Sequence, residues 1–261
     1  MQANVLTKRR LNSGLFAAAV ILLALGAMVL TEFDPAEGLA SIPAALLWGI
    51  TNFYPDAASF EKLPDILPKL AETLLMSIAA AVSGGVFALA FAVAGSKTTG
   101  INPFFQAICR AIATVFRNID VAVWTMILLF SFGQTPITGY FALFFGAFGF
   151  LTRAFMETID EVSSSSVEAL RATGAGYLPI VFQSVLPACI AQMISWLLFM
   201  IETSIRSATL VGILTGSGIG YAFNLYYKSL NYGAASLVVL TIAAAILLIE
   251  ALSNYVRRAV I

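Results

Sequence analysis

The sequence contains no histidine and only two cysteines, and both scarcities limit its chemistry. Histidine and cysteine are common zinc ligands, and histidine is the most frequent general acid or base in enzymes. Cys109 and Cys189 lack metal-ligand spacing, so we interpret both as packed thiols and expect neither a metal site nor a redox site. The apolar stretches also lack a carboxylate cluster, which argues against general-base catalysis within them.

Charged residues are scarce as well. Only 11% of the 261 residues are charged, whereas 60% are hydrophobic. This leaves too little polar surface to cover a soluble globule, so the composition predicts an integral membrane protein surrounded by lipid. The 14 basic and 14 acidic residues balance to a net charge of zero, and no excess positive charge points to nucleic acid as a partner.

Continuous apolar runs predict an all-α, polytopic membrane protein with about six transmembrane helices. A bilayer crossing needs about 20 mostly apolar residues. A transmembrane β-barrel would instead show alternating strands of about ten residues. The predicted spans are 15–30, 70–93, 116–132, 137–155, 188–205 and 234–252. We expect them to form a single transmembrane domain over residues 1–261.

The first apolar run has a second interpretation, because it follows Lys8, Arg9 and Arg10 as the core of a secretory signal does. Small residues at Ala24 and Gly26 offer a cleavage site. The run continues to residue 30, and this favours a retained helix.

Basic residues gather on one side of the predicted arrangement. If successive helices alternate in direction, one side receives Lys8, Arg9, Arg10, Lys97, Arg110, Arg117, Arg153, Arg171, Arg257 and Arg258. The segment 31–68 is rich in acidic residues, has Lys62 as its basic residue, and suits the opposite side. Since basic loops stay in the cytoplasm, we expect both termini there, in a multi-pass protein of the plasma or inner membrane.

A polar stretch that begins with four serines separates the fourth and fifth predicted helices. Ser165 and Glu168 fit a capping box, in which the Glu returns to the amide of the capping Ser. Gly174 and Gly176 allow backbone conformations closed to other residues, and Pro179 suits the first turn of a following helix. These features predict two short helices at an angle, although an ordinary polar loop capped through Glu168 would share the local pattern.

The spacing within residues 163–187 resembles the signature of ABC importer permeases. In that family, Glu-Ala-Ala, three residues, Gly, nine residues, Ile, one residue and Leu-Pro form the cytoplasmic loop that fits the ATPase. The matching positions are Glu168, Ala169, Gly174, Leu186 and Pro187. Leu170 and Ser184 replace the second Ala and the Ile. The resemblance implies a type I permease fold with cytoplasmic coupling helices, which dock on ABC ATPase subunits.

The chain has no phosphate-binding loop of the form that ends in Gly-Lys-Ser or Gly-Lys-Thr. The glycines of residues 216–220 follow a membrane helix instead of a strand, so we interpret this run as a turn. We therefore expect no cofactor in this chain. The resemblance implies a transport subunit that is not itself an enzyme, with ATP bound by a partner subunit.

Three further segments resemble the permeases of phosphonate ABC importers. They are Leu-Ala-Glu-Thr-Leu-Leu-Met-Ser at 70–77, Phe-Arg-Asn-Ile-Asp-Val-Ala-Val-Trp at 116–124 and Glu-Thr-Ser-Ile-Arg-Ser-Ala-Thr-Leu-Val-Gly at 202–212. Asp120 stands where that branch has Pro. The resemblance implies a phosphonate or related phosphorus oxyanion as cargo, an extracytoplasmic substrate-binding protein, and a second copy of the chain across the path.

The residues predicted to line the translocation path are Arg206, Glu202, Arg117, Ser207 and Thr209. A charge at the bilayer centre costs roughly 2.5–3.5 kcal/mol on insertion scales, so we expect these charges to avoid lipid. Guanidinium forks match phosphonate oxygens. The alternative is structural, because Glu202 and Arg206 lie four residues apart in the favourable order for a helical ion pair.

Two other functions fit the sequence. The docking signature does not select cargo, so a permease for another small solute, such as an amino acid or a metal chelate, would carry it too. A membrane channel or membrane-embedded enzyme belongs to a different class, and the missing catalytic side chains argue against the enzyme.

Overall fold

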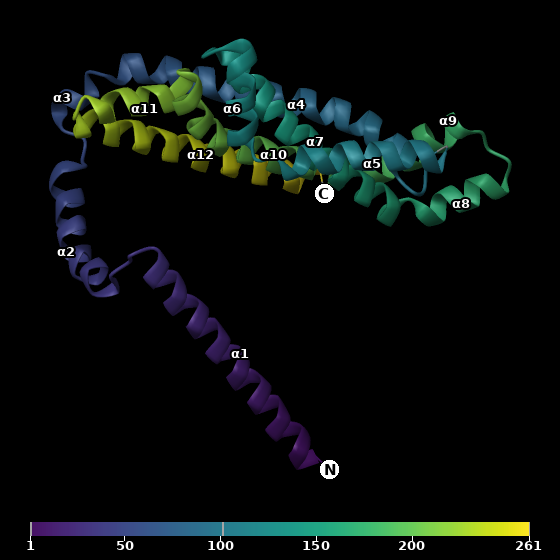
Figure 1. The fold of residues 1–261 in the computed structure, drawn as a ribbon. Helices are drawn as coiled ribbons and strands as arrows, with labels where there is room; N and C mark the ends of the chain where they lie inside the picture. The colour runs from purple at the N-terminus through teal and green to yellow at the C-terminus, as the bar shows by residue number, and fades with distance from the viewer. Residues whose placement is uncertain (1, 101, 261) are drawn as a thin grey trace. The chain divides into compact units, whose positions relative to one another are not determined.

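The computed structural model describes residues 2–100 and 102–260, and within them the protein is helical, without strands (Figure 1). The elements are α1 (Gln2–Leu30), α2 (Pro35–Asn52), α3 (Ala57–Phe60), α4 (Leu63–Gly95), α5 (Pro103–Asn118), α6 (Val121–Phe132), α7 (Pro136–Val162), α8 (Ser164–Ala172), α9 (Tyr177–Ile180), the π-helix η1 (Val181–Val185), α10 (Leu186–Thr215), α11 (Gly218–Lys228) and α12 (Tyr232–Val260). The all-α prediction is confirmed.

Within the described residues, five helices are long and apolar enough to cross a membrane, and a sixth crossing results if the bent pair α5 and α6 is one span. This agrees with the six predicted spans. Both cysteines are buried, as expected for packed thiols.

The chain divides into two compact units, Met1–Phe53 and Tyr54–Ile261. In the first, Asp34 begins α2 by accepting hydrogen bonds from the amides of Ala36 and Glu37, a normal N-cap. The second unit contains α3 to α12, and all the candidate site residues lie in it.

The core of the second unit lies where α7 packs against α4, α5 and α10. Leu151 and Ile159 of α7 are fully buried there. A glycine allows α5 to approach closely, because a Cβ atom on Gly149 would lie 2.5 Å from the amide nitrogen of Arg117. Small residues of this kind let membrane helices pack at short distance, so α7 is the central support of the unit.

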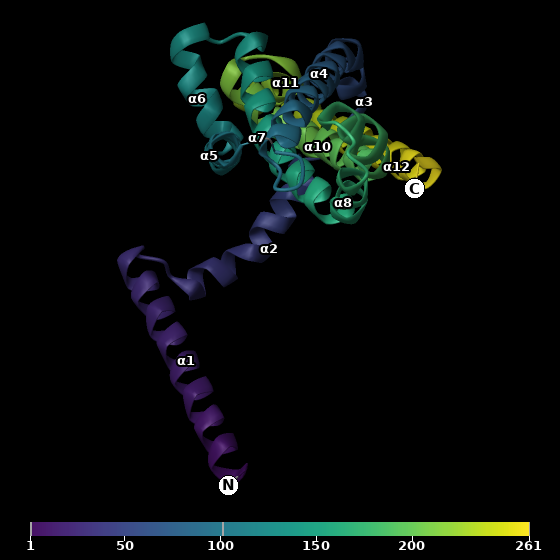
Figure 2. The same ribbon diagram turned by 90° about the vertical axis from the view of Figure 1, so that its right-hand side faces the viewer.

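The third predicted span, 116–132, is not one helix. The structure ends α5 at Asn118 and starts α6 at Val121, with a bend of 93° between them (Figure 2). Asp120 causes the new start, because its extended backbone leaves the helix and its carboxylate accepts a hydrogen bond from the amide of Ala122 at 2.8 Å.

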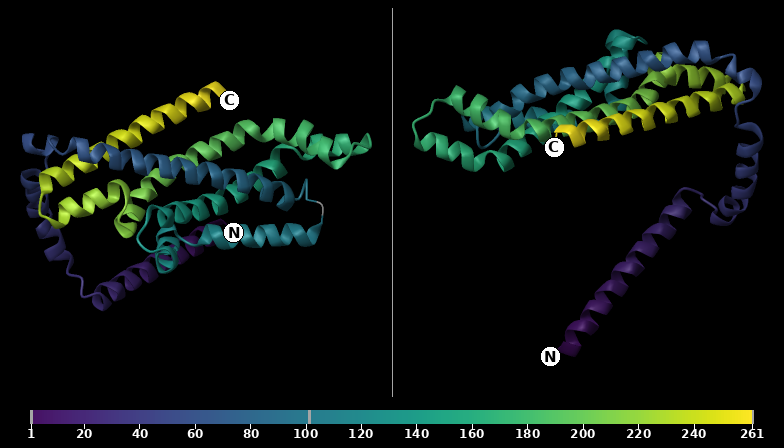
Figure 3. Two further views of the ribbon diagram at one scale, coloured as in Figure 1. Left: turned by 90° about the horizontal axis from the view of Figure 1, so that it is seen from above. Right: turned by 180° about the vertical axis from the view of Figure 1, so that it is seen from behind.

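The fifth predicted span is longer than expected. Elements α9, η1 and α10 form one apolar stretch, Tyr177–Thr215 (Figure 3). It ends at Gly216, whose positive φ of 68° is the usual left-handed helix cap. The predicted turn is therefore confirmed at residues 216 and 217, whereas Gly218 and Gly220 belong to α11.

Candidate coupling segment and transport residues

The segment predicted to dock on a partner lies at one end of the second unit, away from α3 and α11 (Figure 1). Helix α8 follows α7 almost directly, because the intervening Ser163 keeps a helical backbone. Its hydroxyl donates to the carbonyl of Ile159 at 2.6 Å. The predicted capping box is wrong: α8 begins before Ser165 and has no side-chain cap bond.

Helix α8 attaches to the core by one face and presents the other to solvent. Val167 is 1% exposed, and Leu170 packs against the same core cluster. Glu168 and Ala169 are exposed. The two signature residues of α8 are thus held on an outward face by apolar anchors, which suits contact with another protein.

Gly174 ends α8 in the manner that the sequence predicts. Its φ of 79° is left-handed, and the next amide, of Ala175, returns to the carbonyl of Leu170. The same expectation for Gly176 is wrong, since its φ of −70° with ψ of 169° is open to any residue.

Leu186 and Pro187 lie inside the long helix instead of at the end of a loop. Pro187 lacks an amide proton, and its ring would clash with the carbonyl four residues earlier in a regular α-helix. The π-helix η1 precedes it, and the amide of Leu186 reaches back five residues to the carbonyl of Val181. The second of the two expected short helices, α9, is therefore the beginning of a long one, with Pro179 in its first turn as predicted.

The interpretation of Glu202 and Arg206 as a local ion pair is wrong. A carboxylate oxygen of Glu202 lies 2.9 Å from a guanidinium nitrogen of Arg257 on α12. The two side chains are 14% and 29% exposed. Within the described residues, no carboxylate lies within ion-pair distance of Arg206, whose guanidinium has only a 3.5 Å contact with the hydroxyl of Thr203.

The other residues predicted to line the path lie on two different helices. Ser207 and Thr209 are half-buried on α10, near Arg206 in the chain. Arg117 lies on α5, and its guanidinium carbon is 5.8 Å from the ring centroid of Phe150, a cation–π distance. Asp120 caps α6 and forms no ion pair with Arg117 in the described part of the chain. No hydrogen bond or ion pair there joins Arg117 to Arg206.

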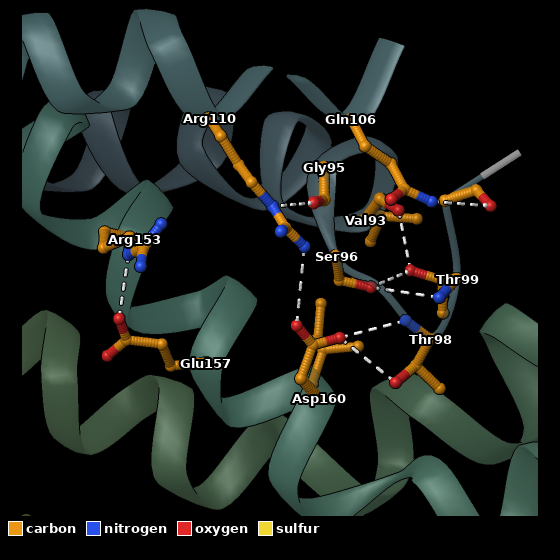
Figure 4. A network of polar contacts seen from close by, with 12 residues as sticks. Val93, Gly95, Ser96, Thr98, Thr99, Gln106, Arg110, Arg153, Glu157 and Asp160 are labelled. Carbon is orange, nitrogen blue, oxygen red and sulfur yellow. Dashed lines mark hydrogen bonds and ion pairs between the residues drawn. The ribbon is translucent and has the colours of Figure 1, made fainter. Parts of the chain in front are cut away.

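A polar network that sequence reasoning missed connects the helices near α8 (Figure 4). Asp160 of α7 accepts hydrogen bonds from both the amide and the hydroxyl of Thr98, at 3.0 and 3.1 Å. Arg110 of α5 lies 3.8 Å from the same carboxylate. Arg171 of α8 donates to the carbonyl of Thr98 at 2.8 Å. The only sequence signal was an acidic residue close to the predicted coupling segment.

Residues 84–261 match the family model of the inner membrane component of binding-protein-dependent transport systems. The chain belongs to this family. Like the other members of the family, this permease is a transport component embedded in a membrane. The predicted class of ABC importer permease is therefore confirmed.

Curated relatives include proteins named for phosphorus oxyanions, in agreement with the predicted resemblance. A phosphate-import permease of Mycolicibacterium smegmatis is 26% identical over 193 residues, which cover 74% of this chain but only 36% of that protein. A phosphite transport system permease of Stutzerimonas stutzeri is 27% identical over 189 residues, or 72% of this chain and 69% of the relative.

The fold is that of a known importer. A chain of the inward-facing MetNI methionine ABC transporter superposes with a TM-score of 0.69 at 20% identity, covering 77% of this chain and 98% of that one. This likeness confirms the permease fold that the docking signature predicts, and it concerns the fold alone.

Proposed function

We propose that this permease carries a phosphonate or a related phosphorus oxyanion in an ATP-driven ABC importer. The observation that supports this cargo most directly is the state of Arg206. Arg257 occupies the carboxylate of Glu202, so the exposed guanidinium of Arg206 has no carboxylate partner among the described residues. An exposed cation on an apolar helix is costly in lipid. A water-filled path or an anion would remove that cost.

Arg206 suits this cargo by geometry as well as by charge. A guanidinium offers a planar pair of donors to two oxygens of a phosphonate, phosphite or phosphate group. Ser207 and Thr209 add neutral donors on the same helix. The relatives named for phosphate and phosphite agree with such an anion.

Transport would proceed by alternating access. An extracytoplasmic binding protein delivers the anion to two copies of this chain, and two ABC ATPase subunits contact α8 through Glu168 and Ala169, which are exposed. ATP binding by those subunits switches which side of the path is open. In this scheme, α8 and both termini lie in the cytoplasm.

Arg206→Gln tests the cargo. In liposomes that contain the permease, its ATPase and its binding protein, we expect uptake of labelled methylphosphonate to fall by about tenfold to a hundredfold. A charge-assisted hydrogen bond is worth about 1.5–3 kcal/mol, and each 1.4 kcal/mol corresponds to about tenfold.

Arg258→Gln is the matched control, because Arg258 is also exposed and the variant removes the same charge. It should retain full uptake. Wild-type uptake by Arg206→Gln would contradict the proposed role. Wild-type protein that transports methionine, and none of methylphosphonate, phosphite or phosphate, would establish the amino-acid alternative.

A further inference from the structure

The turn between α4 and α5 is stiffened by its own side chains. The hydroxyls of Ser96 and Thr99 lie 2.6 Å apart, and the amide of Thr99 donates to Ser96 Oγ at 3.0 Å. Thr99 Oγ1 also donates to the carbonyl of Val93, in the last turns of α4, at 2.7 Å. Both Ser96 and Thr99 are buried. A displacement imposed on this turn is therefore passed to the end of α4 instead of being absorbed by the loop.

Thr98, in the middle of this turn, is held from two directions, and Figure 4 shows its contacts with Asp160. Its amide and hydroxyl donate to Asp160 of α7, and its carbonyl accepts from Arg171 of α8. All the polar groups of one residue are thus committed to two other helices. The contacts span 62 residues to Asp160 and 73 residues to Arg171.

Asp160 extends the connection to α5. Its second oxygen faces Arg110, and the Nε of Arg110 donates to the carbonyl of Gly95 at 3.0 Å, at the end of α4. Arg110 thereby bridges α4, α5 and α7. A cavity of about 300 Å³ lies beside Arg110 and Asp160, and it leaves the guanidinium and carboxylate room to shift.

We infer that Arg171, Asp160 and Arg110 transmit the movement of α8 to the α4–α5 turn and to α5. This inference rests on the proposed docking of an ATPase at α8. The apolar anchors of α8 tie it to the core, whereas Arg171 is its direct polar link to a turn outside the coupling segment. The three side chains are positioning residues for coupling, and none of them needs to touch the cargo.

If Arg110 and Asp160 served only to stabilise the fold, removing them would destabilise the permease. The Arg110–Asp160 pair is long, at 3.8 Å, and both side chains are about a quarter exposed, at 28% and 27%. Partly solvated pairs of this kind contribute little to stability. Their removal should therefore leave the folded permease intact and change its response to nucleotide.

Arg171→Met and Asp160→Asn test the inference in the permease–ATPase complex reconstituted in liposomes. We expect both variants to co-purify the wild-type amount of ATPase and to keep its basal hydrolysis. Stimulation of hydrolysis by the loaded binding protein should fall about fivefold or more. Arg171→Lys, which retains a donor, should recover part of it.

Arg153→Met is the matched control, because Arg153 pairs at 2.8 Å with Glu157 of its own helix and has no ion pair to a second element within the described residues. It should behave as wild type. Arg171 and Asp160 both contact Thr98. If they act through it, the double variant Arg171→Met with Asp160→Asn should lose no more stimulation of ATP hydrolysis than the more impaired single variant. Additive losses would contradict a shared route.

Amide hydrogen exchange in residues 96–100 gives a readout that needs no cargo. In the wild-type complex, a non-hydrolysable ATP analogue should change exchange in this turn relative to ADP, and Arg171→Met should abolish the change. If Arg171→Met shows the same nucleotide-dependent change in exchange as wild type, the inference is overturned. It is also overturned if that variant fails to bind ATPase, because Arg171 would then be a docking residue. A wild-type turn that responds to nucleotide, in a complex that ignores every phosphorus oxyanion, would overturn the proposed cargo alone.

Discussion

At the scale of single residues, the pair of Glu202 and Arg257 determines which charge on α10 lacks a partner among the described residues. It joins α10 to α12, and Arg257 Nε is buried without a hydrogen-bond partner in the described part of the chain. Arg257 Nη2 donates to the Glu202 carboxylate at 2.9 Å, and Nη1 lies 3.4 Å from the side-chain oxygen of Asn254. Arg206, one helical turn further along α10, is left with no acid partner there.

Removing one member of this pair should destabilise the permease more than removing both. Glu202→Gln or Arg257→Gln leaves a mostly buried charge without its partner, and we expect a loss of about 1–3 kcal/mol, less than for a fully buried pair because Arg257 retains some solvent contact. Thermal unfolding in detergent measures the effect.

The double variant Glu202→Gln with Arg257→Gln removes both charges and is the control. It should recover most of the lost stability. Destabilisation equal to the sum of the single variants would show that the two charges do not interact.

The partners of these residues could not be predicted from local spacing. Glu202 and Arg206 are in the favourable order for a helical pair, and the alternative, structural interpretation of these two residues relied on that order. The observed partner of Glu202 lies 55 residues away on α12, so only the packing of two helices brings it near. The contact between Asp160 and Thr98 could not be predicted for the same reason, because the two residues lie 62 positions apart in the sequence.

At the scale of helices, Asp120 sets the course of the chain between α5 and α6. Without a capping side chain, the amides at the start of α6 would lose a hydrogen-bond acceptor beside apolar surroundings. The bend of 93° then brings α6 out of line with α5.

Asp120→Ala should destabilise the permease by about 1 kcal/mol, because it removes this N-cap. Asp120→Asn is the matched variant, since Asn caps helices as well as Asp does. Thermal unfolding of both variants would check the prediction. Equal losses for Ala and Asn would assign the effect to the charge of Asp120 and not to its cap.

Elements with strong local signals were predictable, and those set by competing signals were not. Long apolar runs predicted α4, α7 and α12, and Gly174 predicted the end of α8. The run at 116–132 is mostly apolar from Val121 onward, so hydropathy outweighed the capping signal at Asp120. The fifth span was predicted to begin only after Pro187, at residue 188, but the wider π-turn before Pro187 accommodates its ring within one helix.

At the scale of the whole molecule, one long helix of the second unit connects the two regions that we propose to be functional. The coupling segment leads into α9 and α10 at one end, and Arg206 lies further along α10. Helices α4 and α7 both pack against α10, and α7 also contacts α8. A partner that pushes on the coupling segment therefore acts on the helix that carries the proposed anion residue.

Glu168→Ala should impair the permease only in its complex. Glu168 is exposed on α8, so we expect unchanged thermal unfolding of the isolated permease and about a tenfold loss of binding-protein-stimulated ATP hydrolysis, as for the loss of one charged contact worth about 1.4 kcal/mol.

Glu61→Ala provides the control, because Glu61 is also exposed and follows α3 at the opposite end of the second unit (Figure 1). It should leave ATP hydrolysis unchanged. Hydrolysis by Glu168→Ala at the wild-type level would remove Glu168 from the proposed contact with the ATPase.

The π-helix Val181–Val185 has a consequence for the rotational phase of α10. One residue advances an α-helix by about 100°, and a π-turn holds one residue more than an α-turn with the same hydrogen-bond ends. The stretch Tyr177–Thr215 therefore holds one residue more than a uniform α-helix with the same number of turns would hold. The extra residue therefore rotates the rest of the helix about its axis, and it sets the direction in which the side chain of Arg206 points relative to α8.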